Sequence, residues 1–407
     1  MKTILPKIKF KNFYEKWNRK KLQSIAPLRG GFAFKSEKFQ DSGIPIVRIS
    51  NIKFDGTVGG EFEYYSKVNP DEKFVLRGRS ILLAMSGATT GKIAMLDSNE
   101  EYYQNQRVGY FQNTGAVDYD FLSSVLQTKE FTNQLNSVLV AGAQPNISSK
   151  EIDSFVFCIP ESLDEQSAIG SLFRTLDELL ASYRDNLANY QSLKATMLSK
   201  MFPKAGQTVP EIRLDGFEGE WEKGTIGEFG FFYYGKSAPK WSVTDEATTP
   251  CVRYGELYTK FSTKIDKIYS YTSIPKDNLK LSSGNEVLVP RVGENPLDFA
   301  NCSWLSLKGV AIGEMISVYN TPNNPLFIAY YFNAKMKKEF AKRVEGGSVA
   351  NLYYTYLENI SISVPSLPEQ QAIGAYFLNL DNLINSHQEK ISQLETLKKK
   401  LLQDMLI

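Results

Sequence analysis

The sequence contains an internal repeat with one constant spacing. Pro6, Ile8, Phe13 and Trp17 recur 204 positions later as Pro210, Ile212, Phe217 and Trp221. The same spacing relates residues 162–170, which read SLDEQSAIG, to residues 366–374, which read SLPEQQAIG. Because one spacing relates two separate segments, the chain is a tandem duplication. The stretches between these segments are much less alike, so we expect a shared scaffold that carries two diverged middles.

Length and composition bound the class of protein. A chain of 407 residues suits about two domains of ordinary size. It is 42% apolar and 23% charged, and no run of about 18 apolar residues could span a bilayer. The basic start lacks the apolar run of a secretory signal, and Cys158, Cys251 and Cys302 are scattered. We therefore expect a cytoplasmic protein with no membrane contact.

The repeat predicts where the chain divides. Each half begins with a leader repeat, continues with a globular domain and ends with a long helix. The predicted segments are a leader repeat (1–17), a first recognition domain (18–160), a central helix (161–203), a second leader repeat (204–221), a second recognition domain (222–364) and a distal helix (365–407).

Both terminal helices carry strong local signals. Ser162 with Glu165, and Ser366 with Glu369, have the spacing of a capping box, which predicts a helix start at each place. Apolar residues then follow at alternating steps of four and three, which is the pattern of a coiled-coil seam. The predicted seam residues are Ile169, Phe173, Leu176, Leu180 and Leu187 in the first helix, and Ile373, Phe377, Leu380, Ile384 and Ile391 in the second.

The fold class follows from these patterns. Neither helix can bury its stripe alone, so we expect the two to pair as an antiparallel coiled coil with a pseudo-twofold arrangement of the halves. Lys194 and Lys398 interrupt the seam at the same place in each copy, and Gly170 and Gly374 are positions at which each helix could kink. Apolar runs at 44–49, 80–85 and 286–289 predict strands, and the patterns at 119–134 and 326–343 predict helices. The prediction is an α+β protein with two α/β recognition domains separated by two helices.

Motifs for chemistry are incomplete. The loop Gly87–Lys92 lacks both the first glycine and the final hydroxyl of a phosphate-binding loop, so it is either a DNA phosphate contact or a strand-connecting turn. Asn324–Phe327 lacks a proline of the related methyltransferase motif, and Asp71–Lys73 has no matching upstream aspartate. His387 is the only histidine and falls on the helix seam, which excludes a multi-histidine metal site. Without a catalytic constellation, recognition becomes the leading hypothesis.

Candidate recognition residues are polar or basic and stand near predicted strand ends. Asparagine, glutamine and arginine can each pair bidentately with base edges in the major groove of DNA. In the first domain the candidates are Lys35, Ser36, Arg48, Ser50, Asn51, Thr89, Thr90, Lys92, Asn105, Gln106, Arg107 and Gln144. In the second domain they are Lys236, Lys240, Arg253, Tyr254, Arg291 and Asn295.

Two of these arginines stand in matched contexts. Arg48 follows Pro-Ile-Val and Arg253 follows Pro-Cys-Val, so each domain presents an arginine at one equivalent place. A DNA contact and a structural salt bridge are both open interpretations of this pair. The net charge of only +2 indicates that any phosphate contacts are local or are shared with a partner.

The combined pattern resembles the specificity (S) subunit of type I restriction-modification systems, and the resemblance covers the whole chain. Its carriers are the second leader (210–221), the segment 31–36, residues 86–92, Asn105 with Gln106, and residues 365–370. The resemblance implies two target recognition domains, each reading one half of an asymmetric split DNA target, and two helices that separate them. The second domain departs from the pattern, because 291–295 stands roughly where the first domain has 87–92. The first leader, 6–17, is a degraded version of the second.

The resemblance also implies the partners. These are double-stranded DNA, two methyltransferase subunits docked on the helices, and two restriction subunits as further partners. The chain itself would be non-catalytic and would bind no cofactor, whereas S-adenosylmethionine, ATP and magnesium would belong to partner subunits. The alternative is a non-nucleic coiled-coil scaffold whose two ends bind proteins.

Overall fold

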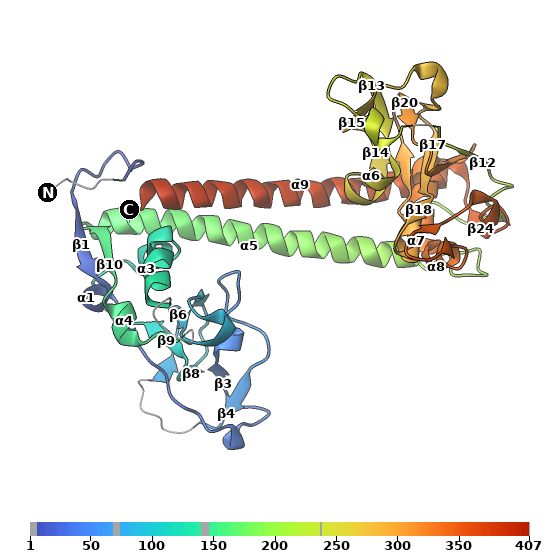
Figure 1. Ribbon diagram of the computed structural model, residues 1–407. Helices are drawn as coiled ribbons and strands as arrows, with labels where there is room; N and C mark the ends of the chain where they lie inside the picture. Colours follow the sequence, from blue (N-terminus) through green and yellow to red (C-terminus); the bar gives the residue numbers. More distant parts are fainter. Residues whose placement is uncertain (1–5, 68–73, 140–145, 237, 407) are drawn as a thin grey trace. The chain divides into compact units, whose positions relative to one another are not determined.

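The computed structural model describes residues 6–67, 74–139, 146–236 and 238–406. The chain divides into two compact units (Figure 1). Unit 1 comprises residues 1–184 and 389–407, and unit 2 comprises residues 185–388.

The long helices are shared between the units. Helix α5 (Leu163–Lys200) has 38 residues and α9 (Leu367–Met405) has 39. Each helix begins in one unit and ends in the other. The compact units therefore do not coincide with the segments predicted from the sequence, because each long helix, predicted as one segment, is divided between the two units. Both helices begin directly after the predicted serines, so the two predicted helix starts are confirmed.

Among the residues that the structure describes, no helix is long and apolar enough to cross a membrane.

Unit 1 contains two small sheets and a two-stranded ribbon before α5. The sheets have the strand orders β2-β9-β6-β7 and β4-β3-β8-β5, and the ribbon pairs β1 with β10. The elements are β1 (Trp17–Lys21), α1 (Leu22–Ile25), β2 (Leu28–Arg29), η1 (Ser36–Lys38), β3 (Ile44–Val47), η2 (Ile49–Asn51), β4 (Glu63–Tyr65), β5 (Val75–Leu76), β6 (Ser80–Ala84), η4 (Gly87–Thr89), β7 (Ile93–Leu96), β8 (Tyr102–Gln104), β9 (Val108–Phe111), α2 (Tyr119–Val125), α3 (Lys129–Leu139), α4 (Ser149–Asp153) and β10 (Val156–Pro160).

Unit 2 repeats this plan with additions. Its sheets have the orders β12-β21-β17-β19-β14, β15-β13-β20-β16 and β18-β23-β22, and its ribbon pairs β11 with β24. The elements are β11 (Glu222–Thr225), β12 (Phe231–Tyr234), η5 (Lys240–Ser242), β13 (Thr249–Val252), α6 (Tyr254–Thr259), β14 (Lys264–Ile265), β15 (Ser270–Thr272), η6 (Lys276–Asn278), β16 (Leu281–Ser283), β17 (Glu286–Pro290), β18 (Val292–Gly293), η7 (Pro296–Ala300), β19 (Ser303–Leu305), β20 (Lys308–Ile312), β21 (Ile316–Asn320), α7 (Pro325–Lys335), α8 (Lys337–Ala341), β22 (Glu345–Gly346), β23 (Ala350–Asn351), η8 (Tyr354–Tyr356) and β24 (Ser361–Val364).

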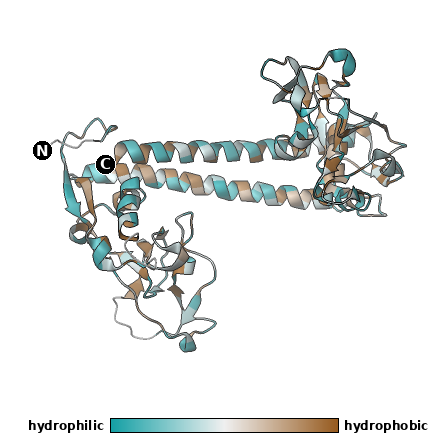
Figure 2. Ribbon diagram, viewed as in Figure 1, coloured by the Kyte–Doolittle hydropathy of each residue, from teal (hydrophilic) through white to brown (hydrophobic). Residues whose placement is uncertain are grey.

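The diverged middles keep one topology. In both units a four-stranded sheet has a parallel central pair, β3 with β8 and β13 with β20, flanked on each side by an antiparallel neighbour. In the other sheet, β6 and β17 are central and buried at every position, which explains their uninterrupted apolar runs. Figure 2 shows hydrophilic and hydrophobic residues alternating along both long helices. The predicted α+β class with duplicated α/β domains is confirmed.

A buried carboxylate joins each leader to the start of its long helix. Glu165 and Glu369 are 0% and 1% exposed. Trp17 donates its indole N–H to Glu165 (3.2 Å), and the Lys9 ammonium lies 3.5 Å from the same oxygen. In the second copy Arg213, which stands 204 positions after Lys9, binds both oxygens of Glu369 at 2.8 and 2.7 Å. Each leader thus supplies partners for one buried carboxylate.

Neither predicted capping box is therefore complete. The Ser162 hydroxyl does accept the Glu165 backbone N–H at 3.3 Å. The Glu165 and Glu369 side chains, however, point to the leaders rather than back to the serines. A carboxylate at this helix position can take either partner, and the sequence pattern of a capping box does not distinguish them.

The glutamine that follows each of these glutamates forms a second repeated contact. The Gln166 amide donates to the Pro160 carbonyl and accepts the backbone N–H of Asp118, both at 2.8 Å. The Gln370 amide donates to Pro365 and accepts the N–H of Asn324, also at 2.8 Å. Asp118 and Asn324 are the N-caps of α2 and α7. Each glutamine thus ties the ribbon end to the N-cap of one helix, α2 in unit 1 and α7 in unit 2.

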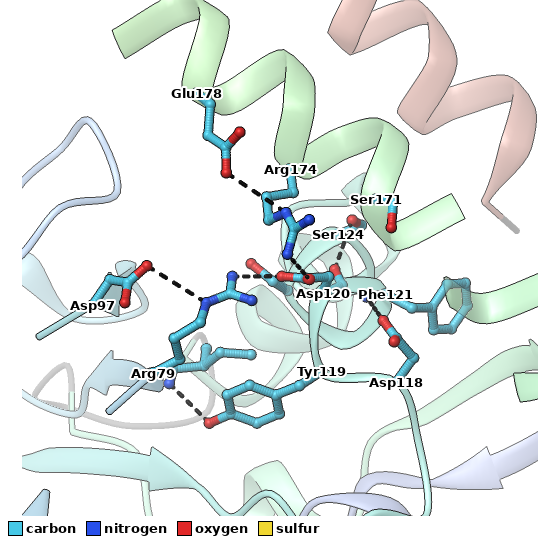
Figure 3. Close-up of polar contacts among 12 residues, drawn as sticks. Arg79, Asp97, Asp118, Tyr119, Asp120, Phe121, Ser124, Ser171, Arg174 and Glu178 are labelled. Atoms are coloured by element: carbon cyan, nitrogen blue, oxygen red, sulfur yellow. Dashed lines mark hydrogen bonds and ion pairs between the residues drawn. The ribbon is translucent and has the colours of Figure 1, made fainter. Parts of the chain in front are cut away.

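Unit 1 adds a charged tie between α2 and α5. The Asp120 carboxylate binds Arg79 at 2.5 Å and Arg174 at 3.2 Å, and Arg174 also lies 3.6 Å from Glu178 (Figure 3). The Tyr119 hydroxyl donates to the Phe111 carbonyl at 2.6 Å and accepts the Ile81 N–H. Helix α2 is therefore fixed to both the sheet and α5.

The long helices run antiparallel where they meet. In unit 1, Lys398 pairs with Asp177, and Arg184 pairs with Glu395 at 2.6 Å. In unit 2, Lys194 pairs with Asp381 at 2.5 Å. Asp381 lies 204 positions after Asp177, so the same ion pair occurs twice with the two helices exchanging roles. Each seam lysine thus has an aspartate on the partner helix.

The predicted seam residues all lie on the covered side of their helices. Ile169, Phe173, Leu176, Leu180, Ile373, Phe377 and Leu380 are buried, and Leu187, Ile384 and Ile391 are half-buried. His387 also lies on this side, where its ring packs edge-on against Tyr190 at 5.1 Å.

Helices α5 and α9 run unbroken through Gly170 and Gly374, so neither glycine ends its helix. Both positions instead allow a close approach of a neighbouring helix start. A Cβ at Gly170 would lie 2.4 Å from the Phe121 nitrogen, and one at Gly374 would lie 3.3 Å from the Asn324 Oδ1.

We expect Gly170→Ala to destabilise the protein by about 1–3 kcal/mol, because backbone atoms of α2 would have to move. Gly374→Ala should be close to neutral, since its milder contact is offset by a helix-propensity gain of about 1 kcal/mol. Thermal unfolding of the two variants beside the parent chain checks this. Equal stability of the two variants would contradict the packing explanation.

Candidate functional site

In unit 1 the strand ends converge on one edge. Strands β3 and β8 are parallel, so Arg48 and Asn105, which follow them, stand at the same edge. Strand β6 ends beside the start of β9, which brings the loop 86–92 to the turn 105–107. This convergence explains why polar residues far apart in sequence gather in one place.

Backbone hydrogen bonds hold these loops together. The Asn105 N–H donates to Val47, and the Gln106 N–H donates to Phe32. Gly31 makes the approach possible, since a Cβ there would lie 2.1 Å from the Asn105 carbonyl oxygen. Gly235, which stands 204 positions later, would meet the Gly313 oxygen at the same distance. The segment 31–36 is therefore placed by a contact that both units share.

We call the resulting set of side chains the unit 1 loop surface. Lys35, Ser36, Ser50, Gln106 and Arg107 are exposed, and Arg48, Thr89, Thr90, Lys92 and Asn105 are half-buried. Most of these candidates follow β3 or lie in the loop 86–92 or the turn 105–107, and Lys35 and Ser36 belong to the segment 31–36. Asn51 is buried, and Gln144 lies outside the described residues.

Asn51 has a structural role instead of the predicted exposed one. It is 1% exposed, and its side chain accepts the Arg48 N–H at 2.9 Å. Its amide also donates to the carbonyls of Gly59 and Glu61. With these bonds the side chain has no exposed group to offer a base. Asn51 is therefore removed from the candidate contacts.

The matched arginines have different surroundings. The Arg48 guanidinium lies 3.2 Å from the Glu63 carboxylate, as the salt-bridge interpretation requires. Arg253 begins α6 and lines a pocket in unit 2. Their backbones remain equivalent, because each N–H donates to the side chain three residues on, Asn51 or Glu256. The shared sequence context thus reflects a shared turn at the strand end.

The loop 86–92 is a strand connection between β6 and β7. The N–H groups of Thr90, Gly91 and Lys92 donate to carbonyls of Gly87, Ala84 and Thr89. These three amides are therefore not available to wrap a phosphate. The Lys92 ammonium lies over the ring of Phe54, which is 90% exposed. The side chains of this loop and its other backbone N–H groups remain candidate contacts.

Unit 2 presents a corresponding edge. Strands β13 and β20 are parallel, so Arg253 and the turn 313–315 stand together. A pocket of about 240 Å³ lies there, and Lys240, Arg253 and Tyr254 line it with Ala238, Pro239, Val292, Gly313, Glu314 and Met315. We call these residues, with Lys236 and Arg291, the unit 2 loop surface. The Lys236 N–H donates to Ile312, and the Arg291 N–H donates to Met315.

Asn295 stands apart from the other second-domain candidates. Its side chain caps η7 by accepting the Leu297 N–H at 3.2 Å, although the residue is exposed. Glu314 is an acidic member of the surface that sequence reasoning missed. A carboxylate opposes phosphate contact, but it can accept a hydrogen bond from cytosine N4.

Two exposed aromatic residues were also missed. Phe54 follows η2, and Trp241, which is 74% exposed, follows Lys240 in η5. No spacing or motif in the sequence distinguishes either residue from an aromatic residue that packs inside the protein. Only the exposed fraction of the side chain identifies these two.

The described residues contain no group of three or more histidine, cysteine, aspartate or glutamate side chains that could hold a metal ion. All three cysteines are buried. Burial raises the pKa of the Cys251 thiol to about 11, and it raises the pKa of Cys302 well above its usual value. These two thiols therefore stay protonated and unreactive near neutral pH.

Comparison with known proteins gives one family. Residues 14–189 and 218–396 each match the sequence profile described as "Type I restriction modification DNA specificity domain". The putative type I restriction enzyme MjaX specificity subunit of Methanocaldococcus jannaschii is 22% identical over 96% of this chain and 93% of its own length. The MjaVIII specificity subunit of the same organism is 25% identical over 46% of this chain, and the match spans 45% of that relative.

A solved structure shares the fold. The type I restriction-modification S subunit from M. genitalium matches with a TM-score of 0.64, covering 99% of each chain at 15% sequence identity. At this identity the likeness concerns the fold alone.

We expect Asn51→Ala to destabilise the protein by about 1–3 kcal/mol, because buried backbone groups lose their partners. Ser50→Ala, at the exposed neighbouring position, serves as the matched control and should leave stability unchanged. Thermal unfolding of both variants measures the difference. Equal melting temperatures would contradict the structural role of Asn51.

Proposed function

The chain belongs to the family of type I restriction-modification DNA specificity proteins, and from this membership we propose that it recognises a specific DNA sequence on behalf of a type I restriction-modification complex. Each unit reads one half of a split target through its loop surface. The helices α5 and α9 keep the two half-sites apart, and the bases between them are not read.

One observation carries the proposal of two different half-sites. The units share the order and direction of the strands around β3 with β8 and around β13 with β20, yet the residues at their strand ends differ. Lys92 and Gln106 belong to the unit 1 loop surface, whereas Lys240 and Tyr254 belong to that of unit 2. Unequal sets of donors and acceptors favour unequal sequences. We therefore propose an asymmetric bipartite target.

The long helices support the proposal of two methyltransferase partners. Leu179 and Leu193 of α5 are exposed, and so are Leu383 and Leu397 of α9, each of which follows its counterpart by 204 positions. Large apolar side chains on a surface are typical of protein contacts. Because unit 1 carries Leu179 with Leu397 and unit 2 carries Leu383 with Leu193, we propose one equivalent docking face on each unit.

The chemistry belongs to the partners in this proposal. The chain acts as a non-catalytic subunit in the cytoplasm, and S-adenosylmethionine, ATP and magnesium bind methyltransferase and restriction subunits. Two restriction subunits complete the nuclease form of the complex. The net charge of +2 fits a subunit that shares phosphate contacts with its partners.

The test is a map of adenine methylation in a host genome. The methyltransferase partner is expressed in both arms, and this chain is present in one arm only. We expect a new, split and asymmetric motif that depends on the chain. The arm with the methyltransferase alone is the control for methylation that needs no specificity subunit.

The opposite result is equally clear. If a stable complex with an active methyltransferase produces no new motif, the chain is not a DNA-specificity subunit. Absence of salt-dependent DNA binding by the same complex would then favour the protein-scaffold alternative.

A further inference from the structure

One backbone pair occurs at the same place in both units. In unit 1, Ala84 of β6 pairs with Val108 of β9, and the Met85 N–H then donates to the Arg107 carbonyl at 2.9 Å. In unit 2, Pro290 of β17 pairs with Ile316 of β21, and the Arg291 N–H donates to the Met315 carbonyl at 3.2 Å. Met85 thus corresponds to Arg291, and Arg107 corresponds to Met315.

The residues of this pair are exchanged between the units. Each pair consists of one arginine and one methionine, but the arginine precedes β9 in unit 1 and follows β17 in unit 2. The exchange is invisible in the sequence repeat, because Arg291 does not stand 204 positions after Met85 and Met315 does not stand 204 positions after Arg107. Each unit therefore has one arginine in this backbone pair. The arginine stands beside β9 in unit 1 and beside β17 in unit 2, and these two strands do not correspond.

The surroundings of Arg291 restrict its side chain. Its guanidinium carbon lies 4.4 Å from the centre of the Tyr234 ring and 5.3 Å from that of Tyr353. Arginine stacks favourably on aromatic faces, which limits the number of orientations it can adopt. The residue is half-buried, and its Nε is buried without a hydrogen-bond partner in the described structure.

Neither arginine is neutralised. Among the described residues, no carboxylate lies within 4.0 Å of the Arg107 or Arg291 guanidinium, whereas Arg48, Arg79 and Arg213 all have such a partner. Arg107 is exposed, and its backbone N–H donates to the Asn105 Oδ1 at 3.3 Å. Both side chains thus keep donor groups for a partner outside the chain.

Given the proposed function, on which this step rests, we propose that Arg107 and Arg291 are the guanine-reading residues of the two units, one in each half-site. The paired N–H groups of a guanidinium match the O6 and N7 acceptors of guanine in the major groove. Arg107 carries its fork on an exposed turn, while Arg291 carries its fork on a stack of two tyrosine rings. Each half-site therefore contains a G·C pair whose identity depends on one arginine.

The variants are taken from the chain itself. Arg291→Met gives unit 2 the residue that unit 1 has at the equivalent position, Met85. Arg107→Met gives unit 1 the residue that unit 2 has at the equivalent position, Met315. Arg291→Gln and Arg107→Gln are second variants that keep polar side chains. Arg343→Gln in unit 2 and Arg19→Gln in unit 1 are the controls. Arg343 pairs with Glu339, and Arg19 lies on the ribbon strand β1.

The readout is the methylated motif obtained with each variant and the methyltransferase partner. Arg291→Met should make one G·C position degenerate in one half-site, with a loss of discrimination of about 5- to 150-fold, and should leave the other half-site intact. Arg107→Met should do the same in the other half-site. The control variants should yield the parental motif.

Several outcomes would overturn the inference. One is an unchanged motif with either methionine variant in a complex that still assembles. Another is an equal loss of affinity for all DNA sequences together with a weaker dependence of that affinity on salt concentration, since this indicates a phosphate contact. If a methionine variant does not assemble, the glutamine variant decides by the same criteria. Failure of the proposed function itself is distinguishable, because the parental chain would then yield no motif at all.

Discussion

The buried carboxylates of Glu165 and Glu369 are the contacts on which the rest of each half depends. A carboxylate that is fully removed from water is tolerated only with a partner, and the leader provides one: Lys9 with Trp17 in the first copy, and Arg213 in the second. The adjacent glutamines extend the junction to α2 and α7. Leader, ribbon, long helix and the N-cap of α2 or α7 thus meet at one point, and two of these parts, the leader and the start of the long helix, are the segments that recur in the sequence.

The amino-acid sequences of the two loop surfaces can diverge because the loop surfaces follow strand ends, whereas the junction lies at the start of each long helix. The loop surfaces are built from turns that follow β3, β6 and β8, or β13, β17 and β20, and they need only a few backbone contacts such as the one that Gly31 and Gly235 allow. The exposed side chains on these turns, unlike the buried Asn51 and Met85, carry little of the packing. Substitution there changes what is presented without changing the fold, which is the physical basis of two different units on one duplicated scaffold.

The fold was largely predictable, because its signals are local or periodic. The spacing of 204 positions, the heptads and the apolar runs predicted the duplication, the paired helices and the central strands β6 and β17. The site was less predictable, because the role of a polar residue depends on neighbours that are distant in sequence. Asn51 was a candidate DNA contact, yet its side chain is buried and bonded to Arg48, Gly59 and Glu61. The correspondence of Met85 with Arg291, and of Arg107 with Met315, required strand pairing, because neither pair of positions is related by the constant spacing.

The central claim is that one scaffold carries two independent reading units. Its most direct test is a chain in which residues 222–364 replace residues 18–160, so that the second recognition domain occurs twice. The methylation motif of its complex is then determined by sequencing. The account predicts a palindromic split motif in which both halves equal the half-site of unit 2. A motif that remains asymmetric, or that keeps the half-site of unit 1, would contradict it.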